Sequence, residues 1–280
     1  VEHSAVRLAA ARHGDVTVVG ADSVGRIDPA ALLDAVRPDT ALVHVQWANH
    51  EVGTRQPVAE VVAECRQRGV LVHVDAASAA GHEPIAFDEL GADVLSVSGH
   101  KLGAPPGVGA LLVRRGLRLP ALLVGDDRER ARRAGFENVP AALGFGAACE
   151  ALLLGGVERE ASAQRALTDR VLDAAGSLAG VVVYGDPVDR LPHIVCLGIT
   201  DVEPQAVLLG LDRLGVAAHS GSACSSEALE PSPVLEAMGL DALRSLRVSV
   251  GWSTTDFDVD AFTDALPRVL SDLRTLAARG

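Results

Sequence analysis

Lysine is almost absent from this chain of 280 residues: among its 25 basic residues, Lys101 is the single lysine and the others are arginines. A guanidinium stays protonated and cannot form an imine, whereas the amine of a desolvated lysine can deprotonate and attack a carbonyl. In a chain that otherwise uses arginine, a single lysine therefore indicates a position where a function requires an amine that arginine cannot supply. Lys101 is a candidate Schiff-base lysine, and the alternative is a solvated surface residue, which is the commoner state of a lysine.

Long hydrophobic runs and paired cysteines are missing as well. No stretch approaches the roughly 18 uninterrupted apolar residues of a membrane-spanning helix, and the first residues lack the basic start and apolar core of a secretory signal. The four cysteines form no CxxC pair, which argues against a zinc site and a disulfide framework. The formal charge of −12 argues against nucleic acid as the main ligand. We therefore expect a cytoplasmic enzyme that binds neither a metal nor a membrane.

The first half of the chain shows strand and helix patterns in alternation. Asp28 followed by Pro29 is typical of a helix N-terminus, and Gly69 is typical of a helix end. Strands are predicted at 16–19, 41–45, 70–74, 94–96 and 109–113, and helices at 30–36 and 57–68. Strands joined by helical crossovers imply a mostly parallel sheet, whose ligands collect beyond the carboxyl ends of the strands.

The pattern changes after about residue 154. Helices are predicted at 158–174, at 204–214 and from 259 onward, and strands at 181–184 and 194–197. We therefore predict an α/β protein with two domains, a large, mostly parallel domain at 1–150 and a smaller α+β domain at 151–280.

Asp75 and Lys101 both fall just past the end of a predicted strand. This pairing suits pyridoxal phosphate, which needs an amine for its aldehyde, a carboxylate for its pyridine nitrogen and hydrogen-bond donors for its phosphate. Asp75 is the candidate partner of the pyridine nitrogen, and Ser98 and His100 are candidate phosphate ligands. Taken alone, an aspartate at a strand end is more often a cap or turn residue, so this interpretation depends on the combination with Lys101.

Four motifs then carry a resemblance to a known family. They are HVDA at 73–76, SVSGHK at 96–101, SGSAC at 220–224 and LRVSVG at 246–251. In this order and spacing, along nearly the whole chain, they resemble the cysteine desulfurases of the NifS/IscS type within the class V aminotransferase group. The resemblance implies the fold of the type I pyridoxal-phosphate aminotransferases, a homodimer, and conversion of L-cysteine to L-alanine. The sulfur is expected to remain on the enzyme as a persulfide until a sulfur-acceptor protein takes it.

The resemblance also assigns a role to individual residues. Lys101 holds the cofactor and then moves the proton of the substrate Cα, while Asp75 pairs with the pyridine nitrogen. His3 stacks on the cofactor ring and assists proton transfer. Arg247 binds the substrate carboxylate, a task that suits the fork of a guanidinium.

Cys224 is the expected sulfur acceptor on the enzyme. Small and hydroxylic neighbours indicate a flexible, solvated loop, so the thiol is accessible, and a thiolate is a good nucleophile toward sulfur. The other three cysteines lie within helix or strand patterns and are interpreted as buried hydrophobic residues: Cys65, Cys149 and Cys196.

Four departures from the family pattern are visible. His50 replaces an asparagine expected near the cofactor hydroxyl and the substrate carboxylate, and a histidine can still donate a hydrogen bond there. Ser78 replaces a glutamine and is too short to reach the phenolic oxygen of the cofactor without a water. Phe136 replaces a threonine that crosses the dimer interface to the partner's phosphate. The chain begins at the equivalent of the stacking histidine, so we expect the preceding part of the fold, including a phosphate-binding loop, to be absent.

Two alternatives to a cysteine desulfurase stay open. One is a degenerate relative that keeps the class V fold for a binding or regulatory role, and the four departures favour it. The other is a selenocysteine lyase or another class V lyase with the same machinery. The joint presence of Lys101 and Cys224 favours chemistry, since a binding protein needs neither an amine nor a loop thiol.

Overall fold

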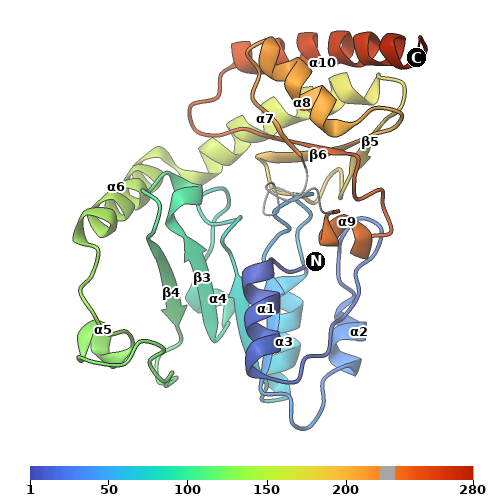
Figure 1. The fold of residues 1–280 in the computed structure, drawn as a ribbon. Coiled ribbons are helices and arrows are strands. Elements are labelled where there is room, and N and C mark those ends of the chain that lie inside the picture. The colour runs from blue at the N-terminus through green and yellow to red at the C-terminus, as the bar shows by residue number, and fades with distance from the viewer. Residues whose placement is uncertain (221–230, 280) are drawn as a thin grey trace. The chain divides into compact units, whose positions relative to one another are not determined.

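The computed structural model describes residues 1–220 and 231–279, and the chain groups into two compact units (Figure 1). Unit 1 comprises Val1–Val36, Ala48–Pro57 and Glu158–Gly280, and unit 2 comprises Arg37–Trp47 and Val58–Val157. The units are therefore interleaved along the chain, whereas the sequence predicts one boundary near residue 150.

Unit 2 is built on a mostly parallel sheet, as predicted. Strands β1, β2 and β3 are parallel to one another, and β4 joins β3 antiparallel. The order in the sheet follows the order in the chain: β1 (Leu42–Gln46), β2 (Leu71–Asp75), β3 (Val94–Ser98) and β4 (Gly109–Val113). The carboxyl ends of the three parallel strands consequently lie at one edge of the sheet.

Helix α3 (Val58–Gln67) packs against β1 and β2 of this sheet. It buries one apolar face, and the valines of the strands alternate with polar residues that point to the opposite face. Unit 2 also contains α4 (Phe87–Leu90), α5 (Arg128–Ala131) and α6 (Val139–Gly155). The alternation gives the sheet one apolar face and one polar face.

Unit 1 contains an antiparallel sheet in the order β5-β6-β8-β7. Its strands are β5 (Val181–Tyr184), β6 (Ile194–Ile199), β7 (His219–Ser220) and β8 (Ser245–Ser249). Three long helices share a hydrophobic core with β6 and β8: α7 (Val157–Gly176), α8 (Pro204–Arg213) and α10 (Asp256–Ala277). Shorter helices complete the unit: α1 (Ser4–His13), α2 (Pro29–Asp34) and α9 (Pro233–Ala237).

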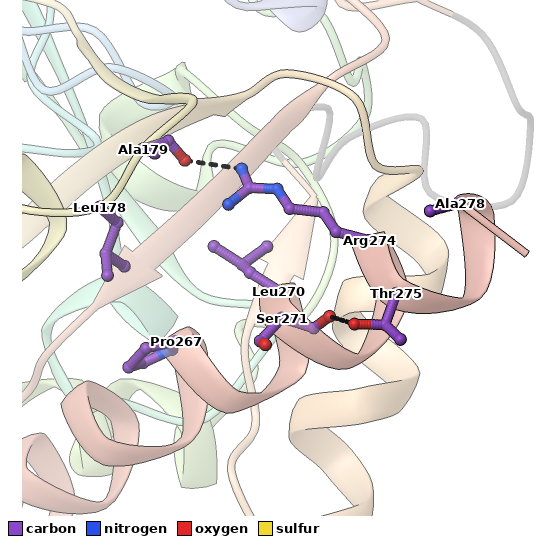
Figure 2. Close-up of a pocket in the computed structure, with 8 residues that line it drawn as sticks. All are labelled: Leu178, Ala179, Pro267, Leu270, Ser271, Arg274, Thr275 and Ala278. Carbon is purple, nitrogen blue, oxygen red and sulfur yellow. Dashed lines mark hydrogen bonds between the residues drawn. The ribbon is translucent and has the colours of Figure 1, made fainter.

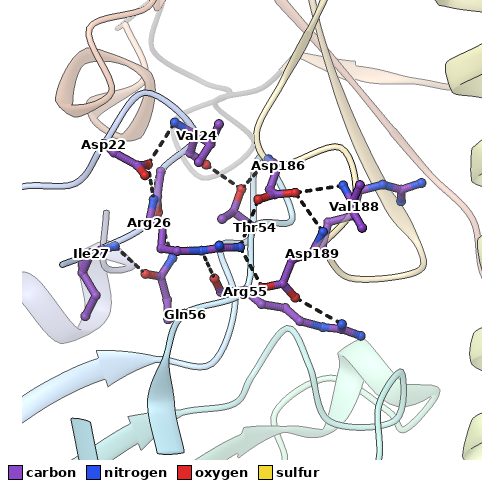
Figure 3. A network of polar contacts seen from close by, with 12 residues as sticks. Asp22, Val24, Arg26, Ile27, Thr54, Arg55, Gln56, Asp186, Val188 and Asp189 are labelled. Atoms are coloured by element: carbon purple, nitrogen blue, oxygen red, sulfur yellow. Dashed lines mark hydrogen bonds and ion pairs between the residues drawn. The ribbon is translucent and has the colours of Figure 1, made fainter. Parts of the chain in front are cut away.

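A network of polar contacts joins the early segments of unit 1 to its later part (Figure 3). The Arg26 guanidinium lies 3.1 Å from Asp186 and 2.7 Å from Asp189, and Arg55 reaches the other oxygen of Asp189 at 3.3 Å. The Thr54 hydroxyl also accepts a hydrogen bond from the backbone N–H of Asp186 at 2.9 Å. These contacts explain why residues distant in sequence belong to one unit.

The predicted strand at 16–19 is wrong. These residues have no regular secondary structure, and Val16 and Val18 are 43% and 74% exposed. A strand is stable only when a neighbouring strand satisfies its backbone groups, and nearby the structure shows just a single bridge, between Ala21 and Ile27. A run of valines and threonine favours extended backbone but cannot supply that neighbour.

A shallow hollow lies beside α10 in unit 1 (Figure 2). Leu178, Pro267 and Leu270 line it, and the Arg274 guanidinium at its edge donates to the backbone oxygen of Ala179 at 2.6 Å. No predicted site residue is among its lining residues. In the described ranges, no helix by itself has the length and hydropathy to cross a membrane, and only α6 and α7 taken as a bent pair meet that test.

Candidate functional site

Lys101 lies on a short 3-10 turn, η1 (Gly99–Leu102), that directly follows β3. A side chain at Gly99 would come within 2.8 Å of the backbone oxygen of Val108, so this tight turn needs a glycine. The Lys101 amine donates to the Ser78 hydroxyl at 3.0 Å, and the His82 ring nitrogen Nε2 lies 3.2 Å from the backbone oxygen of Lys101. Backbone and side chain of the lysine are thus both held within unit 2.

Asp75 is the last residue of β2 and is paired in register with Ser96 of β3. Its Oδ1 accepts from the backbone N–H of Ala77 at 3.0 Å and from the Ser96 hydroxyl at 3.1 Å. Among the described residues, both recorded hydrogen bonds of this carboxylate end on Oδ1. Oδ2 is therefore available to accept from another donor.

Ser98 and His100 lie together where β3 passes into η1. The Ser98 hydroxyl and the His100 Nδ1 are 2.9 Å apart, and His100 is exposed to solvent. One proton lies between the two side chains, so the neutral pair has one N–H or O–H left to donate to an anion. Ser96, which the sequence analysis missed, belongs to the same strand, and its two-residue spacing from Ser98 is the signal that could have found it.

The unit 2 cluster, defined as Asp75, Ser78, Ser98, His100 and Lys101, fits pyridoxal phosphate by its donor set. An amine, a carboxylate with an available oxygen and a serine–histidine pair that can donate to an anion lie at or just past the ends of the neighbouring strands β2 and β3. These are the groups required by the aldehyde, the pyridine nitrogen and the phosphate of that cofactor. Over residues 1–220 and 231–279, no group of three or more His, Cys, Asp or Glu side chains is arranged to hold a metal ion.

His3, from unit 1, caps helix α1. Its Nδ1 accepts a hydrogen bond from the backbone N–H of Ala5 at 3.1 Å. A ring nitrogen that accepts cannot carry a proton, so the neutral ring has its proton on Nε2. The His3 and His50 rings meet edge to face, with their centroids 5.0 Å apart.

Arg247 lies on β8, and its side chain contacts the turn that contains His50. Its Nη1 donates to the backbone oxygen of His50 at 3.2 Å, and the His50 side chain is buried. The structure therefore brings together three predicted site residues of unit 1, which are His3, His50 and Arg247. Together with Glu51 they form the unit 1 cluster.

Glu51 is a buried carboxyl group that the sequence analysis missed. Its Oε2 accepts from the Ser232 hydroxyl at 2.6 Å, and its Oε1 lies 3.6 Å from the Nε2 of His50. Burial raises the pKa of Glu51 to about 7, although the bond from Ser232 and the charge of Arg247 oppose the rise. Nothing in the local sequence marks this glutamate as buried, because the residues that cover it come from distant parts of the chain.

The predicted nucleophile, Cys224, lies outside the described residues. Cys65 and Cys196 are buried, which confirms their predicted structural role, and burial raises the pKa of both thiols. Cys149 on α6 is half-buried. A buried thiol with a raised pKa is a poor nucleophile, which argues against Cys65 and Cys196 as reactive cysteines.

Phe136 of unit 2 is 84% exposed. The Arg128 guanidinium lies over its ring, 4.2 Å from the centroid, and the same guanidinium pairs with Glu137 at 2.6 Å. This aromatic side chain offers no hydrogen bond to a phosphate.

The fold is that of an α/β protein in which an amine, a carboxylate and a serine–histidine pair lie at one edge of a mostly parallel sheet. Comparison with known families agrees, because the sequence model described as aminotransferase class-V matches residues 1–262. A cysteine desulfurase from Gluconacetobacter diazotrophicus is 41% identical over 286 residues, an alignment that covers 99% of this chain and 71% of that protein.

Solved structures give the same answer. A NifS-like protein from Rickettsia africae has a TM-score of 0.87 at 27% identity, covering 96% of this chain and 74% of that one. The structure of SspA in complex with cysteine has a TM-score of 0.74 at 28% identity, covering 89% and 71%. The chain belongs to the class-V aminotransferase family and, within it, to the cysteine desulfurases. It spans from 66% to 74% of the length of these and similar relatives.

Proposed function

We propose that this chain carries the catalytic residues of a pyridoxal-phosphate-dependent cysteine desulfurase, which converts L-cysteine to L-alanine. The observation that carries the proposal is the placement of two residues on neighbouring strands: Asp75 ends β2, and the single lysine lies just past the end of β3. The names of the relatives and the cysteine bound to SspA support the reaction and its substrate.

The unit 2 cluster holds the cofactor in this proposal. Lys101 would hold the aldehyde, the Oδ2 of Asp75 would accept from the pyridine nitrogen, and Ser98 and His100 would bind the phosphate. When bound, pyridoxal phosphate draws electrons away from the amino-acid carbon attached to it, which weakens the bonds at that carbon and the neighbouring carbon–sulfur bond. Ser78 accepts from the Lys101 amine and so orients the group that moves the Cα proton.

The unit 1 cluster handles the substrate. Arg247 binds the carboxylate of L-cysteine through its guanidinium fork. His50 donates a hydrogen bond beside it. His3 presents its protonated Nε2 for proton transfer, because the helix cap occupies Nδ1.

Cys224 receives the sulfur. Its thiolate attacks the substrate sulfur, so a sulfur–sulfur bond forms while the carbon–sulfur bond breaks, and the carbon keeps the electron pair and takes up a proton. The substrate leaves as L-alanine, and Cys224 is left as a persulfide. The overall change is L-cysteine plus enzyme thiol giving L-alanine plus enzyme persulfide, in which atoms and charge balance.

Absorbance of the purified chain with added pyridoxal phosphate tests the proposal. We expect the visible band that the cofactor gains on joining a lysine amine, and its loss in Lys101→Ala. L-cysteine with a reductant is expected to yield sulfide and alanine in the wild type and no sulfide in Cys224→Ala. Cys149→Ala is the matched control and keeps sulfide release.

Two outcomes would overturn the proposal. The first is a wild-type chain without the visible band, which would favour a binding role for the fold. The second is a band without sulfide, which would point to another class V reaction. Comparison of L-cysteine with L-selenocysteine as substrate separates the desulfurase from a selenocysteine lyase.

The homodimer, the sulfur-acceptor protein and the cytoplasmic location belong to the same proposal. Exposed apolar side chains in unit 2 support the dimer, since an interface would remove them from water. They include Leu122, Val124, Phe136, Leu143, Leu153 and Leu154. Sedimentation of the full chain tests this, and a monomer at all concentrations would contradict it.

A further inference from the structure

Four polar side chains form a continuous hydrogen-bonded row across the sheet of unit 2. His44 Nδ1 lies 3.0 Å from His73 Nδ1, and His73 Nε2 lies 3.1 Å from the Ser96 hydroxyl. Ser96 in turn lies 3.1 Å from Oδ1 of Asp75. The row therefore ends on the carboxylate assigned to the pyridine nitrogen.

The register of the sheet produces this row. His44 of β1 is the register partner of His73 of β2, and Asp75 of β2 is the partner of Ser96 of β3. Partners in a parallel sheet point to the same face, as do residues two apart on one strand such as His73 and Asp75. All four side chains thus occupy the polar face, opposite the buried valines.

The protons of the row have one consistent arrangement. Ser96 has a single hydroxyl proton, which it donates to Asp75, so its oxygen must accept from Nε2–H of His73. Burial, together with the nearby His44, lowers the pKa of His73 to about 4, and burial also lowers the pKa of His44, so both rings are neutral near pH 7. With its proton on Nε2, His73 accepts at Nδ1, and His44 must then donate from its own Nδ1.

The opposite direction of the row is unfavourable. If Ser96 donated to His73, its oxygen lone pairs would face the carboxylate of Asp75 with no proton between them. In this half-buried contact, two acceptors that face each other repel and lose hydrogen bonds to water. Each donor therefore points toward Asp75.

We propose that His44, His73 and Ser96 are positioning residues for Asp75: a one-directional hydrogen-bond chain that occupies Oδ1 and turns Oδ2 toward the ring nitrogen of pyridoxal phosphate. The role toward the cofactor rests on the proposed function, whereas the direction of the chain does not. His44 acts through His73, and His73 acts through Ser96.

Nitrogen NMR of the histidine side chains in the full chain without cofactor tests the direction. At neutral pH we expect His73 with its proton on Nε2 and His44 with its proton on Nδ1. The resonances are assigned with His44→Gln and His73→Gln. A His73 ring that is charged, or that carries its proton on Nδ1, would overturn the proposal.

Titration with pyridoxal phosphate tests the role toward the cofactor. Ser96→Ala is expected to mix the two tautomers of His73 and to raise the dissociation constant of the cofactor by about tenfold, because Asp75 loses a charge-assisted hydrogen bond. Ser96→Thr keeps the hydroxyl, so we expect the wild-type tautomer of His73 and the wild-type dissociation constant of the cofactor. When pyridoxal phosphate binds, we expect the His73 resonances to shift. The resonances of His13, which is exposed at the end of α1, are expected to stay unchanged.

The outcomes separate the two proposals. Unchanged His73 tautomers and unchanged cofactor affinity in Ser96→Ala would overturn the positioning role. Failure of the wild type to bind the cofactor would overturn the proposed function instead, and the tautomers of the unloaded chain would still decide the direction of the row.

Discussion

Unit 1 and unit 2 bury their polar groups in different ways. In unit 2, His73 and Ser96 form a row of neutral groups in which each donor meets an acceptor. In unit 1, Glu51 is buried beside His50 with Ser232 as its close donor, and its pKa rises to about 7. The first arrangement holds one protonation state across the physiological range, whereas the second changes state within it.

We propose that the difference reflects a division of labour between a cofactor side in unit 2 and a substrate side in unit 1. A fixed carboxylate suits a cofactor whose ring nitrogen must stay paired throughout the reaction. A carboxyl group that titrates near neutrality suits a region where a substrate with its own charges enters and leaves. Four predictions test this contrast, in order of decreasing effect.

Lys101→Arg is expected to have the largest effect. The arginine keeps the positive charge but cannot deprotonate, so kcat is expected to fall by about 10²–10⁴-fold or more. Sulfide release measures the rate, and the visible band of the loaded chain is expected to disappear with it. A variant that keeps a tenth of the wild-type rate would show that Lys101 does not move the proton.

Glu51→Gln removes the buried carboxyl group of unit 1 whose pKa lies near 7. In the wild type the folded chain keeps this proton between pH 4.5 and about 7 while the unfolded chain releases it, so ionisation costs stability as the pH rises. The stability of the wild type relative to Glu51→Gln is therefore expected to fall by about 3 kcal/mol across this interval. Urea unfolding at a series of pH values measures it. A difference that stays constant with pH would mean that Glu51 titrates normally.

Arg247→Lys replaces the guanidinium fork with a single ammonium. We expect KM for L-cysteine to rise about tenfold with a smaller change in kcat, because a bidentate contact to the carboxylate is lost. Arg244→Lys, just before β8, is the matched control and leaves KM unchanged. An equal rise in both variants would remove Arg247 from the substrate site.

Ser232→Ala is expected to have the smallest effect. Ser232 caps α9 by accepting from the backbone N–H of Leu235 and also donates to Glu51. Its loss is expected to cost about 1 kcal/mol in the free energy of unfolding and to raise the pKa of Glu51 further. Ser232→Thr keeps both bonds and serves as the control. Calorimetry of the wild type, Ser232→Ala and Ser232→Thr measures the free energy of unfolding. Equal values for all three proteins would contradict the prediction.

Local patterns predicted much of the fold. The cap at Asp28, the end of a helix at Gly69 and the strand β2 all appear where expected, although β2 alternates between buried and half-buried residues and was predicted as a continuous apolar run. The same reasoning failed at 16–19, where the residues favour extended backbone but no neighbouring strand pairs with them. It also missed α1 and α6, whose sequences carry no clear period at the helical repeat.

The predicted site residues met a similar limit. Asp75 and Lys101 were predicted from strand ends and from the rarity of lysine, and the motifs extended the prediction to His3 and Arg247. Glu51 could not be found, because its burial depends on Ser232, which is 181 residues away in sequence. A raised pKa is a property of the surroundings, and distant segments build them.

The order of residues alone established which groups can react and which faces of the strands are polar. The amine of Lys101 and the alternation of His73, Val74 and Asp75 follow directly from residue type and the two-residue repeat of a strand. Only the folded sheet decided that His44 meets His73 and that Ser96 meets Asp75, because register is set by pairing between strands remote in the chain. The residue type thus fixes which reactive group a position carries. The direction of a hydrogen bond and the pKa of a buried group depend on neighbours that only the tertiary structure supplies.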